Sequence, residues 1–209
     1  MPRTKKVAVL LDGGFVIKRL RHFLDGEYPE ASQVLEFAQR CVRDDEELFR
    51  IYYYDCPPFD GVSVNPVSGE EVDFSKTSIF EKLQRLQREL AVSEYVAFRK
   101  GVLILNGWRL NRYRAKQLAK NNRALQADDF EPDLEQKRVD MKIGLDVAWM
   151  AIKGIVDSVI LVAGDTDIVP AMDFARQQGM RVILVPMENP YLSESMLEHS
   201  DEVREVRYP

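Results

Sequence analysis

The chain has 209 residues, of which 45% are hydrophobic and 30% charged, a balance typical of one globular domain with a sizeable core. Its formal net charge of −5 excludes nucleic-acid binding by bulk positive charge, so such binding would need a local basic patch. No apolar run approaches the roughly 20 residues of a membrane span, and two cysteines are too few for a disulfide scaffold or a zinc site. We therefore expect a protein of the reducing cytoplasm with no part in the membrane.

Strands and helices are predicted to alternate from the start of the chain. Residues 7–11 form a short, continuous apolar run, typical of a strand that is buried on both faces. Apolar residues at helical spacing over 15–24 predict a helix, and Ser32 is the expected cap of a second one. Residues 48–56, rich in Tyr and Ile, predict the next strand.

The alternation continues to the end of the chain. In chain order we expect a helix, a strand or hairpin, a long helix, a strand, a helix and a strand, at residues 77–91, 95–108, 139–155, 159–162, 169–178 and 181–185. Residues 57–75 and 109–136 are interpreted as insertions or loops of a single domain over residues 1–209. This order predicts the α/β class, a three-layer α/β/α sandwich with a mostly parallel central sheet.

Three acidic residues follow the ends of predicted strands. Asp12 follows the strand at 7–11, and Asp165 and Asp167 follow the strand at 159–162. Ligands bind outside the carboxyl ends of strands in open α/β sheets, and a divalent cation relieves the repulsion between acids that meet there. The alternative is that each Asp caps the following helix, with Asp167 the strongest candidate for a cap. Because one helix needs only one cap, the two acids in one turn favour a Mg²⁺ or Mn²⁺ site.

The predicted helix at 139–155 contains two further acids. The helix is apolar almost all round, so we expect it to be largely buried. Asp140 is the better candidate for a metal ligand, because an isolated acid in an apolar run is costly unless it is paired. The alternatives are that Asp140 is a first-turn acid on the helix dipole and that Asp146 is a surface partner of Lys142 one turn away.

Three segments in series resemble one known family. They are Val9–Gly14 (Val-Leu-Leu-Asp-Gly-Gly), Lys137–Asp140 with Asp146 six residues later, and Ala163–Asp167 (Ala-Gly-Asp-Thr-Asp). Together they are similar to the NYN domain family, within the LabA-like branch of the PIN-like nucleases. The matching parts, about residues 6–56 and 137–187, cover roughly half of the chain in the expected order.

The resemblance implies a PIN-like sandwich with an acidic, metal-dependent ribonuclease site. It implies that one or two Mg²⁺ or Mn²⁺ ions are held by four catalytic acids, with a fifth acid in support; these are Asp12, Asp140, Asp165 and Asp167, and Asp146. Hydrolysis of an RNA phosphodiester would use metal-activated water, so no Ser, Cys or His nucleophile is required. Thr166 would either donate to a phosphate or stabilise its turn, and we favour the turn.

A basic stretch follows the predicted strand or hairpin. Its members are Arg109, Arg112, Arg114, Lys116, Lys120 and Arg123, with Trp108 and Tyr113 among them. Basic groups contact phosphates and aromatic rings stack on unpaired bases, so this stretch is a candidate site for single-stranded RNA. The alternative is a solvated face balanced by the acidic stretch 128–135.

Two other functions remain open. A PIN-like module that binds RNA or protein without turnover is favoured mildly by Phe15 and Ala163, which stand where many members have Asn and Ser; Ile168 likewise replaces a common Phe. The second is a metal-dependent phosphatase or a nucleotide-handling enzyme. Asp12-Gly13-Gly14 lacks the Asp-x-Asp pattern expected of a haloacid-dehalogenase-like phosphatase, and Gly13-Gly14 alone is not a dinucleotide-binding fingerprint. A homodimer is also left open.

Overall fold

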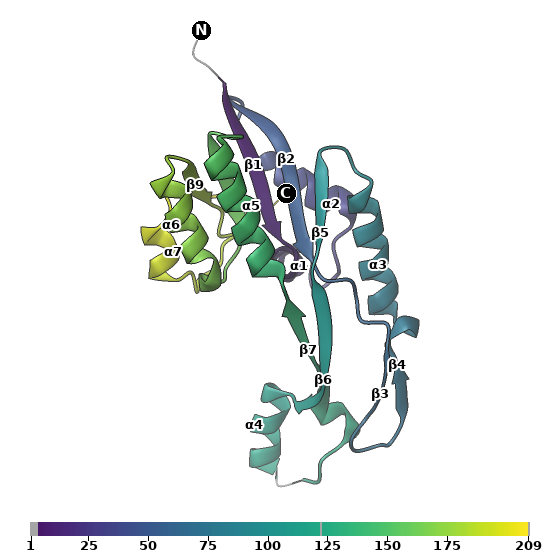
Figure 1. Ribbon diagram of the computed structural model, residues 1–209. Coiled ribbons are helices and arrows are strands. Elements are labelled where there is room, and N and C mark those ends of the chain that lie inside the picture. Colours follow the sequence, from purple (N-terminus) through teal and green to yellow (C-terminus); the bar gives the residue numbers. More distant parts are fainter. Residues whose placement is uncertain (1–3, 122, 209) are drawn as a thin grey trace.

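A six-stranded parallel sheet forms the centre of the protein (Figure 1). The structure is a computed structural model and describes residues 4–121 and 123–208. The strand order is β10-β9-β8-β1-β2-β5, and each neighbouring pair runs parallel. The strands are β1 (Lys5–Asp12), β2 (Glu46–Asp55), β5 (Val96–Lys100), β8 (Ser158–Val162), β9 (Arg181–Leu184) and β10 (Glu202–Val203).

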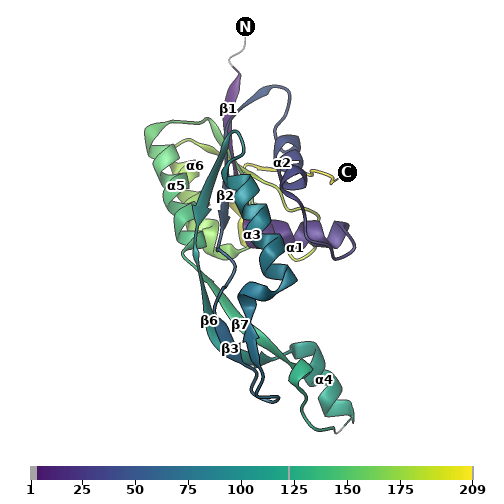
Figure 2. The same cartoon turned by 90° about the vertical axis from the view of Figure 1, so that its right-hand side faces the viewer.

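Helices cover both faces of this sheet, as Figures 1 and 2 show from two sides. On one face lie α1 (Gly13–Phe23), α2 (Ala31–Arg40) and α3 (Ser78–Ala91); on the other lie α5 (Val139–Lys153), α6 (Val169–Gln177) and the short α7 (Glu194–Glu198). Strand β1 serves both cores, because alternate side chains of a strand point to opposite faces. Val9 belongs to the core under α1 to α3, and Leu10 to the core under α5 and α6. The expected α/β/α sandwich is confirmed.

The sheet changes its direction of growth beside β1. The chain adds β2 and β5 on one side of β1, then returns to add β8, β9 and β10 on the other. The gap outside the carboxyl ends of β1 and β8 is therefore a topological switch point, where open α/β sheets bind ligands. Leu11 of β1 is aligned with Val162 of β8, so the segments that follow these two strands start side by side.

A long arm leaves the body at this same edge of the sheet. We define the arm as two antiparallel hairpins and a helix, which are β3 (Val62–Val64) with β4 (Glu71–Asp73), β6 (Val102–Leu110) with β7 (Phe130–Lys137), and α4 (Arg112–Asn121). Figure 1 shows α4 at the far end of the arm. The Trp108 indole Nε1 donates to Ser63 Oγ at 3.0 Å and joins the two hairpins. The two ranges expected to be insertions or loops thus contain much of this arm.

Two local predictions of structure were wrong. Helix α2 is capped by Glu30, whereas Ser32 lies within its first turn. The reason is a reciprocal capping box, in which the Glu30 backbone N–H donates to Gln33 Oε1 at 2.8 Å. Residues 95–108 form neither one strand nor one hairpin, since Gly101 divides β5 of the central sheet from β6 of the arm.

Helix α5 is less buried than its composition predicts. Four apolar side chains along one stripe, Met141, Leu145, Trp149 and Ile152, are between 52% and 69% exposed. The helix packs one side on the sheet and α6, and this stripe faces away from both. Residues three and four apart share a helix face, so these side chains form one continuous apolar surface. Every helix within the described residues is too short or too polar to cross a lipid bilayer.

Candidate active site

Asp12 lies at the centre of the switch point, between β1 and α1. It caps α1, because the backbone N–H of Phe15 donates to its Oδ1 at 3.2 Å. Burial raises the pKa of the Asp12 carboxyl to about 6, and the nearby acids Asp140 and Asp55 add to the rise. The cap alternative therefore holds for Asp12, and Oδ2 of the carboxylate lies outside this cap hydrogen bond.

Asp55, which the sequence analysis did not select, lies next to Asp12 at the end of β2. Only 4% of the residue is exposed, and its carboxylate accepts hydrogen bonds from the Gln87 amide at 2.8 Å and the Cys56 backbone N–H at 2.8 Å. Burial raises the pKa of Asp55 to about 6 in spite of these donors. The signal that would have found it is the one used for Asp12, an acid at the end of an apolar strand.

Asp140 extends the acidic group into α5. It lies in the first turn of that helix. Burial raises its pKa, and the charges of Asp165 and Asp167 raise it further. Because Asp140 also raises the pKa of Asp12, charge repulsion links four predicted site acids and Asp55 into one connected group. We call these five residues, Asp12, Asp55, Asp140, Asp165 and Asp167, the acidic cluster.

Asp165 and Asp167 are exposed at the open end of β8. Asp165 caps a 3₁₀ turn (Thr166–Ile168), as its Oδ1 accepts from the backbone N–H of Asp167 at 3.0 Å. The prediction that Asp167 is the cap was wrong, because this turn precedes α6 and α6 itself begins without a side-chain cap. Thr166 is exposed within the same turn.

The donor chemistry of the acidic cluster fits a hard divalent cation. Its members offer carboxylate oxygens alone, which Mg²⁺ and Mn²⁺ accept. Burial raises the pKa of Asp12 and of Asp140, and the charges of neighbouring acids raise both further. Among residues 4–121 and 123–208, however, no three His, Cys, Asp or Glu side chains are close enough to hold an ion as they stand. Binding would therefore require the carboxylates to move inward.

Asp146 is engaged in a different part of the fold. The Arg99 guanidinium of β5 forms an ion pair with it, with Nε at 2.8 Å from Oδ2, and the buried Tyr54 hydroxyl donates to the same oxygen at 2.9 Å. The expected alternative partner, Lys142, is not the one that the structure records. Asp146 thus joins α5 to β2 and β5, and any support that it gives the acidic cluster acts through the position of α5.

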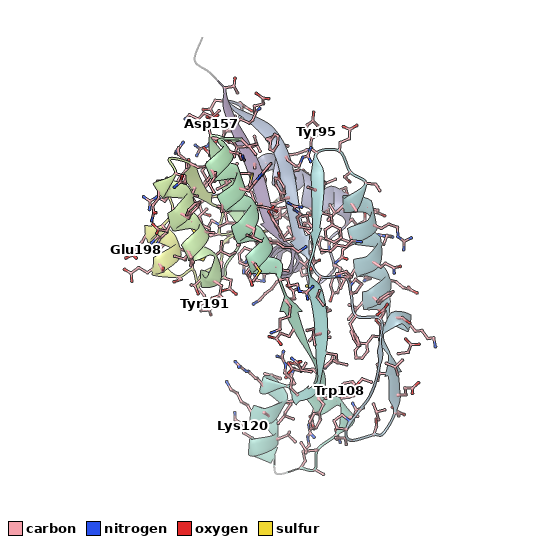
Figure 3. All side chains as sticks on the ribbon, viewed as in Figure 1. Tyr95, Trp108, Lys120, Asp157, Tyr191 and Glu198 are labelled. Atoms are coloured by element: carbon pink, nitrogen blue, oxygen red, sulfur yellow. The ribbon has the colours of Figure 1, made fainter. Side chains whose placement is uncertain are left out.

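The six predicted RNA-binding residues fall into two groups. Arg109 and Arg123 are paired with acids of the same arm: Arg109 Nε lies 2.9 Å from Glu131 Oε1, and Arg123 Nη2 lies 2.5 Å from the Oδ1 of buried Asp129. These two residues are therefore balanced by acids of the stretch 128–135, which is the alternative stated in the sequence analysis. The other four are exposed on α4, with Lys120 at the far end of the arm in Figure 3; they are Arg112, Arg114, Lys116 and Lys120.

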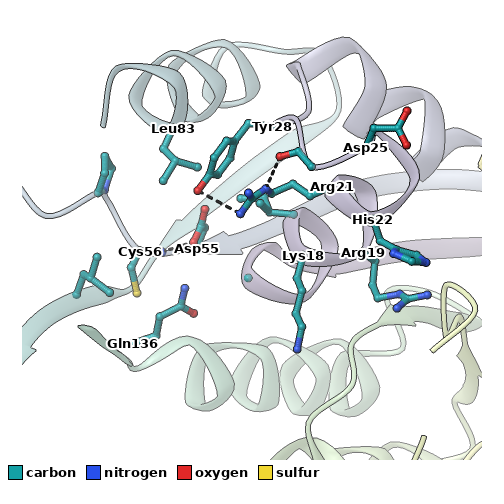
Figure 4. A pocket seen from close by; sticks show the side chains of 15 residues that line it. Lys18, Arg19, Arg21, His22, Asp25, Tyr28, Asp55, Cys56, Leu83 and Gln136 are labelled. Atoms are coloured by element: carbon teal, nitrogen blue, oxygen red, sulfur yellow. Dashed lines mark hydrogen bonds between the residues drawn. The ribbon is translucent and has the colours of Figure 1, made fainter. Parts of the chain in front are cut away.

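A cleft of about 880 Å³ opens beside the acidic cluster, between α1, the base of the arm and α3. Asp55, Gly14 and Gln136 line the end next to Asp12, and Figure 4 shows Lys18 opposite Tyr28 and Leu83. Basic residues of α1 form much of its wall, namely Lys18, Arg19, Arg21 and His22. This wall could not be recognised from the sequence, because four basic residues on the outer side of a helix have no distinctive spacing.

Comparisons with known proteins agree with this architecture. A crystal structure of a protein of unknown function from Vibrio parahaemolyticus has a similar fold, with a TM-score of 0.53 and 17% identity over 99% of this chain and 96% of that one. A search of curated proteins found no match. The NYN domain model matches residues 65–206, which contain Asp140, Asp165 and Asp167 but begin after Asp12. Because the match spans more than half of the sequence and the sandwich is PIN-like, the chain belongs to the NYN domain family.

Proposed function

We propose that the protein is a ribonuclease that hydrolyses RNA phosphodiester bonds with the help of Mg²⁺ or Mn²⁺. NYN domains are generally nucleases, and membership of this family supports the proposed reaction class. The observation that carries the proposal is the acidic cluster at the switch point, where burial and neighbouring acids raise the pKa of Asp12 to about 6. Unbalanced carboxylates at a ligand-binding edge are expected where a cation is to be held.

The proposed roles follow from position. Asp12, Asp140, Asp165 and Asp167 would hold one or two ions, and such ions supply a nucleophile from water and offset charge on the phosphate. Asp55 is fixed by Gln87 and Cys56 and keeps negative charge beside Asp12. Asp146 positions α5, and Thr166 stabilises the turn that presents its two neighbouring acids.

The expected substrate is single-stranded RNA. The exposed basic residues of α4 and the basic wall of α1 offer local positive charge that the net charge of −5 does not. Cys41 and Cys56 are free and buried, which favours the cytoplasm as the location. The exposed stripe of α5 favours a homodimer, because one apolar helix face can meet its own copy across a two-fold axis.

A cleavage assay on a labelled 20-nucleotide single-stranded RNA tests the proposal. The wild type should cut the RNA with Mn²⁺ or Mg²⁺ and not with EDTA. Asp165→Asn should stay folded, because Asn caps about as well as Asp, yet lose cleavage while keeping or gaining RNA affinity. Binding and cleavage are measured on the same preparation.

Asp173→Asn is the matched control, since Asp173 lies in α6 outside the acidic cluster and its carboxylate bonds to Gln177. It should cut like the wild type. Undiminished cleavage by Asp165→Asn would remove Asp165 from the mechanism. RNA binding without cleavage in either metal would identify the chain as a binding module instead.

A further inference from the structure

The cleft beside the acidic cluster has the size and the mixed lining of a small-molecule site. Its volume of about 880 Å³ lies within the roughly 300–1,000 Å³ of small-molecule sites. Apolar side chains of Ile17, Leu83 and Leu103 line it together with basic residues of α1. A ligand that fits would need a flat apolar part and a negative charge.

One wall of the cleft carries Arg21 and Tyr28, whose side chains contact each other. The Arg21 guanidinium lies 4.2 Å from the centre of the Tyr28 ring, and its Nε donates to the Gly26 carbonyl at 3.0 Å. Its Nη1 also approaches the Tyr28 hydroxyl at 3.4 Å (Figure 4). Aromatic rings and Arg planes are the surfaces on which proteins stack unpaired bases. Because Arg21 and Tyr28 already hold each other, little order remains to be lost on binding.

The basic residues of α1 are not equivalent. Arg19 is used by the fold, because its Nε and Nη2 donate to the carbonyls of Met187 and Glu188 at 2.8 Å each. Lys18 is exposed and makes neither a hydrogen bond nor an ion pair with any part of the chain that the structure describes. Figure 4 shows its ammonium on the side of the cleft opposite Tyr28. Lys18 is thus the cation available for a phosphate.

The position of the cleft indicates which molecule fills it. Asp55 lines its inner end, and Asp55 directly follows Tyr54, which is aligned with Asp12 across β1 and β2. Gly14 and Gln136 lie close together at this end, since a Cβ on Gly14 would be 3.3 Å from the Gln136 amide. Because this end of the cleft adjoins the acidic cluster, the next unit of a chain bound at the cluster would lie beside the cleft.

We propose that the cleft holds one unpaired nucleotide of the RNA substrate, next to the phosphate at the acidic cluster. The base stacks on the Tyr28–Arg21 surface, and the phosphate of that nucleotide pairs with Lys18. This inference rests on the proposed function for the identity of the substrate. It adds that the enzyme selects RNA that is unpaired beside the cleaved bond.

A binding assay without metal tests the cleft separately from cleavage. The probe is a fluorescein-labelled tetrauridylate, titrated in EDTA by fluorescence anisotropy. Tyr28→Leu should weaken binding roughly 5- to 100-fold, the effect of losing one base–aromatic stack. Tyr28→Phe keeps the ring and should bind more tightly than Tyr28→Leu. Lys18→Ala should weaken binding, Lys18→Arg should restore it, and Lys153→Ala, at the far end of α5, should change nothing.

Cross-linking locates the bound nucleotide. A tetranucleotide with one 4-thiouridine, irradiated in complex with the wild type, should attach to Tyr28 or to another residue that lines the cleft. Equal affinity of Tyr28→Leu, Lys18→Ala and the wild type would overturn the proposal, as would cross-links confined to other surfaces. Thermal melts show whether Tyr28→Leu is folded; if it is not, Lys18→Ala and cross-linking decide.

Failure of this inference and failure of the proposed function are distinguishable. If the cleft variants bind and cut as the wild type does, the nuclease function stands and the cleft does not hold the substrate. If the wild type binds tetrauridylate in the cleft yet cuts no RNA with Mn²⁺ or Mg²⁺, the cleft stands and the function fails. A probe of the same sequence in a duplex should bind weakly, since its bases cannot reach Tyr28.

Discussion

Asp12 and Asp55 are two carboxyls whose surroundings oppose their charge. Burial raises the pKa of each from 3.8 to about 6. Ordinary buried acids are paired with a base, as Glu46 is with Arg204 at 2.8 Å, and the pKa of Glu46 is lowered. The contrast separates an acid that stabilises the fold from acids kept at the cost of stability, which is typical of functional sites.

The free energy of unfolding should therefore fall as pH rises through about 6. Between 3.8 and about 6 the native Asp55 binds more protons than the unfolded one, so its contribution is full below 3.8 and is lost above about 6. Going from pH 7.5 to 5 in EDTA should stabilise the wild type by about 1 kcal/mol through Asp55 alone. Urea unfolding at the two pH values measures this change.

Asp55→Asn is the comparison for the pH effect. Its absolute stability also changes, because an amide nitrogen would face the donor of Gln87 or Cys56, so the pH dependences are compared instead. Between pH 7.5 and pH 5, the free energy of unfolding should rise less in the variant than in the wild type, by the amount due to Asp55. Saturating Mn²⁺ should flatten the dependence of the wild type, since the cation replaces protons at the acids. A wild type whose stability rises from pH 5 to 7.5 in EDTA contradicts the expectation.

At the scale of elements, two glycines show how closely the site is packed. A Cβ on Gly13 would lie 2.8 Å from the Tyr54 carbonyl oxygen and 2.8 Å from Asp55 Cβ, so α1 can start beside β2 only without a side chain there. Gly144, within α5, meets only Ala171 Cβ at 3.7 Å, an ordinary contact. One glycine is required by close approach and the other is not.

Gly13→Ala should destabilise the protein by about 1–3 kcal/mol, the usual cost of overpacking a well-packed site. Gly144→Ala should stabilise it by about 0.5–1 kcal/mol, because Ala is the better residue inside a helix. Urea unfolding of both variants at one pH checks the pair. Equal effects of the two substitutions would show that the approach of α1 to β2 is looser than the structure has it.

Most elements of the body were predictable from sequence because they have a local signal, whereas the short α7 and β10 were not predicted. Strand β1 is a continuous apolar run between a basic start and two glycines, and Gly179 ends α6 with a φ of +82°. The arm lacks such signals. Strand β7 is polar and is held by pairs with distant residues, such as Glu131 with Arg109 across the hairpin. Pairing of that kind depends on tertiary contacts that a local pattern does not contain.

The acidic cluster was predictable in part for the same reason. Asp12, Asp140, Asp165 and Asp167 were selected by their place at the ends of strands or in an apolar helix. The spacing of apolar residues predicted that α5 is a helix, but it did not show which elements pack against that helix. Neither its exposed stripe nor the Arg99–Asp146 pair could therefore be deduced. The cleft also depends on tertiary contacts, because α1, α3 and β7 meet there from distant parts of the sequence.

At the scale of the whole molecule, the arm places positive charge far from the acidic cluster. Strand β6 has nine residues, from Val102 at the body to Leu110 beside α4, and at about 3.4 Å per residue it spans about 30 Å. Stacked nucleotides rise about 3.4 Å each, so roughly nine nucleotides separate the acidic cluster from α4. A tetranucleotide is shorter than this distance and is expected to reach only one of the two sites.

Removing the charges of α4 should therefore affect long RNA and spare short RNA. Arg112, Lys116 and Lys120 are exposed at four-residue spacing along one face of the helix. The triple change to Ala should weaken binding of a 20-nucleotide single strand and lower the slope of log K against log salt by about 2, at about 0.7 per lost phosphate contact. Binding of tetrauridylate should stay unchanged. Anisotropy titrations of both probes in EDTA, over a series of salt concentrations, measure these effects.

The matched control removes the same charge from the opposite edge of the body. Lys5 begins β1, Arg40 ends α2 and Lys153 ends α5, and all three are exposed. Their triple change to Ala alters the net charge equally, so it reports the effect of overall charge on RNA affinity. If both triple variants lower the salt slope of the 20-nucleotide RNA by the same amount, α4 makes no phosphate contacts. If only the α4 variant lowers the salt slope, and only for the long RNA, α4 binds the substrate about 30 Å from the acidic cluster. This distance is set by the length of β6.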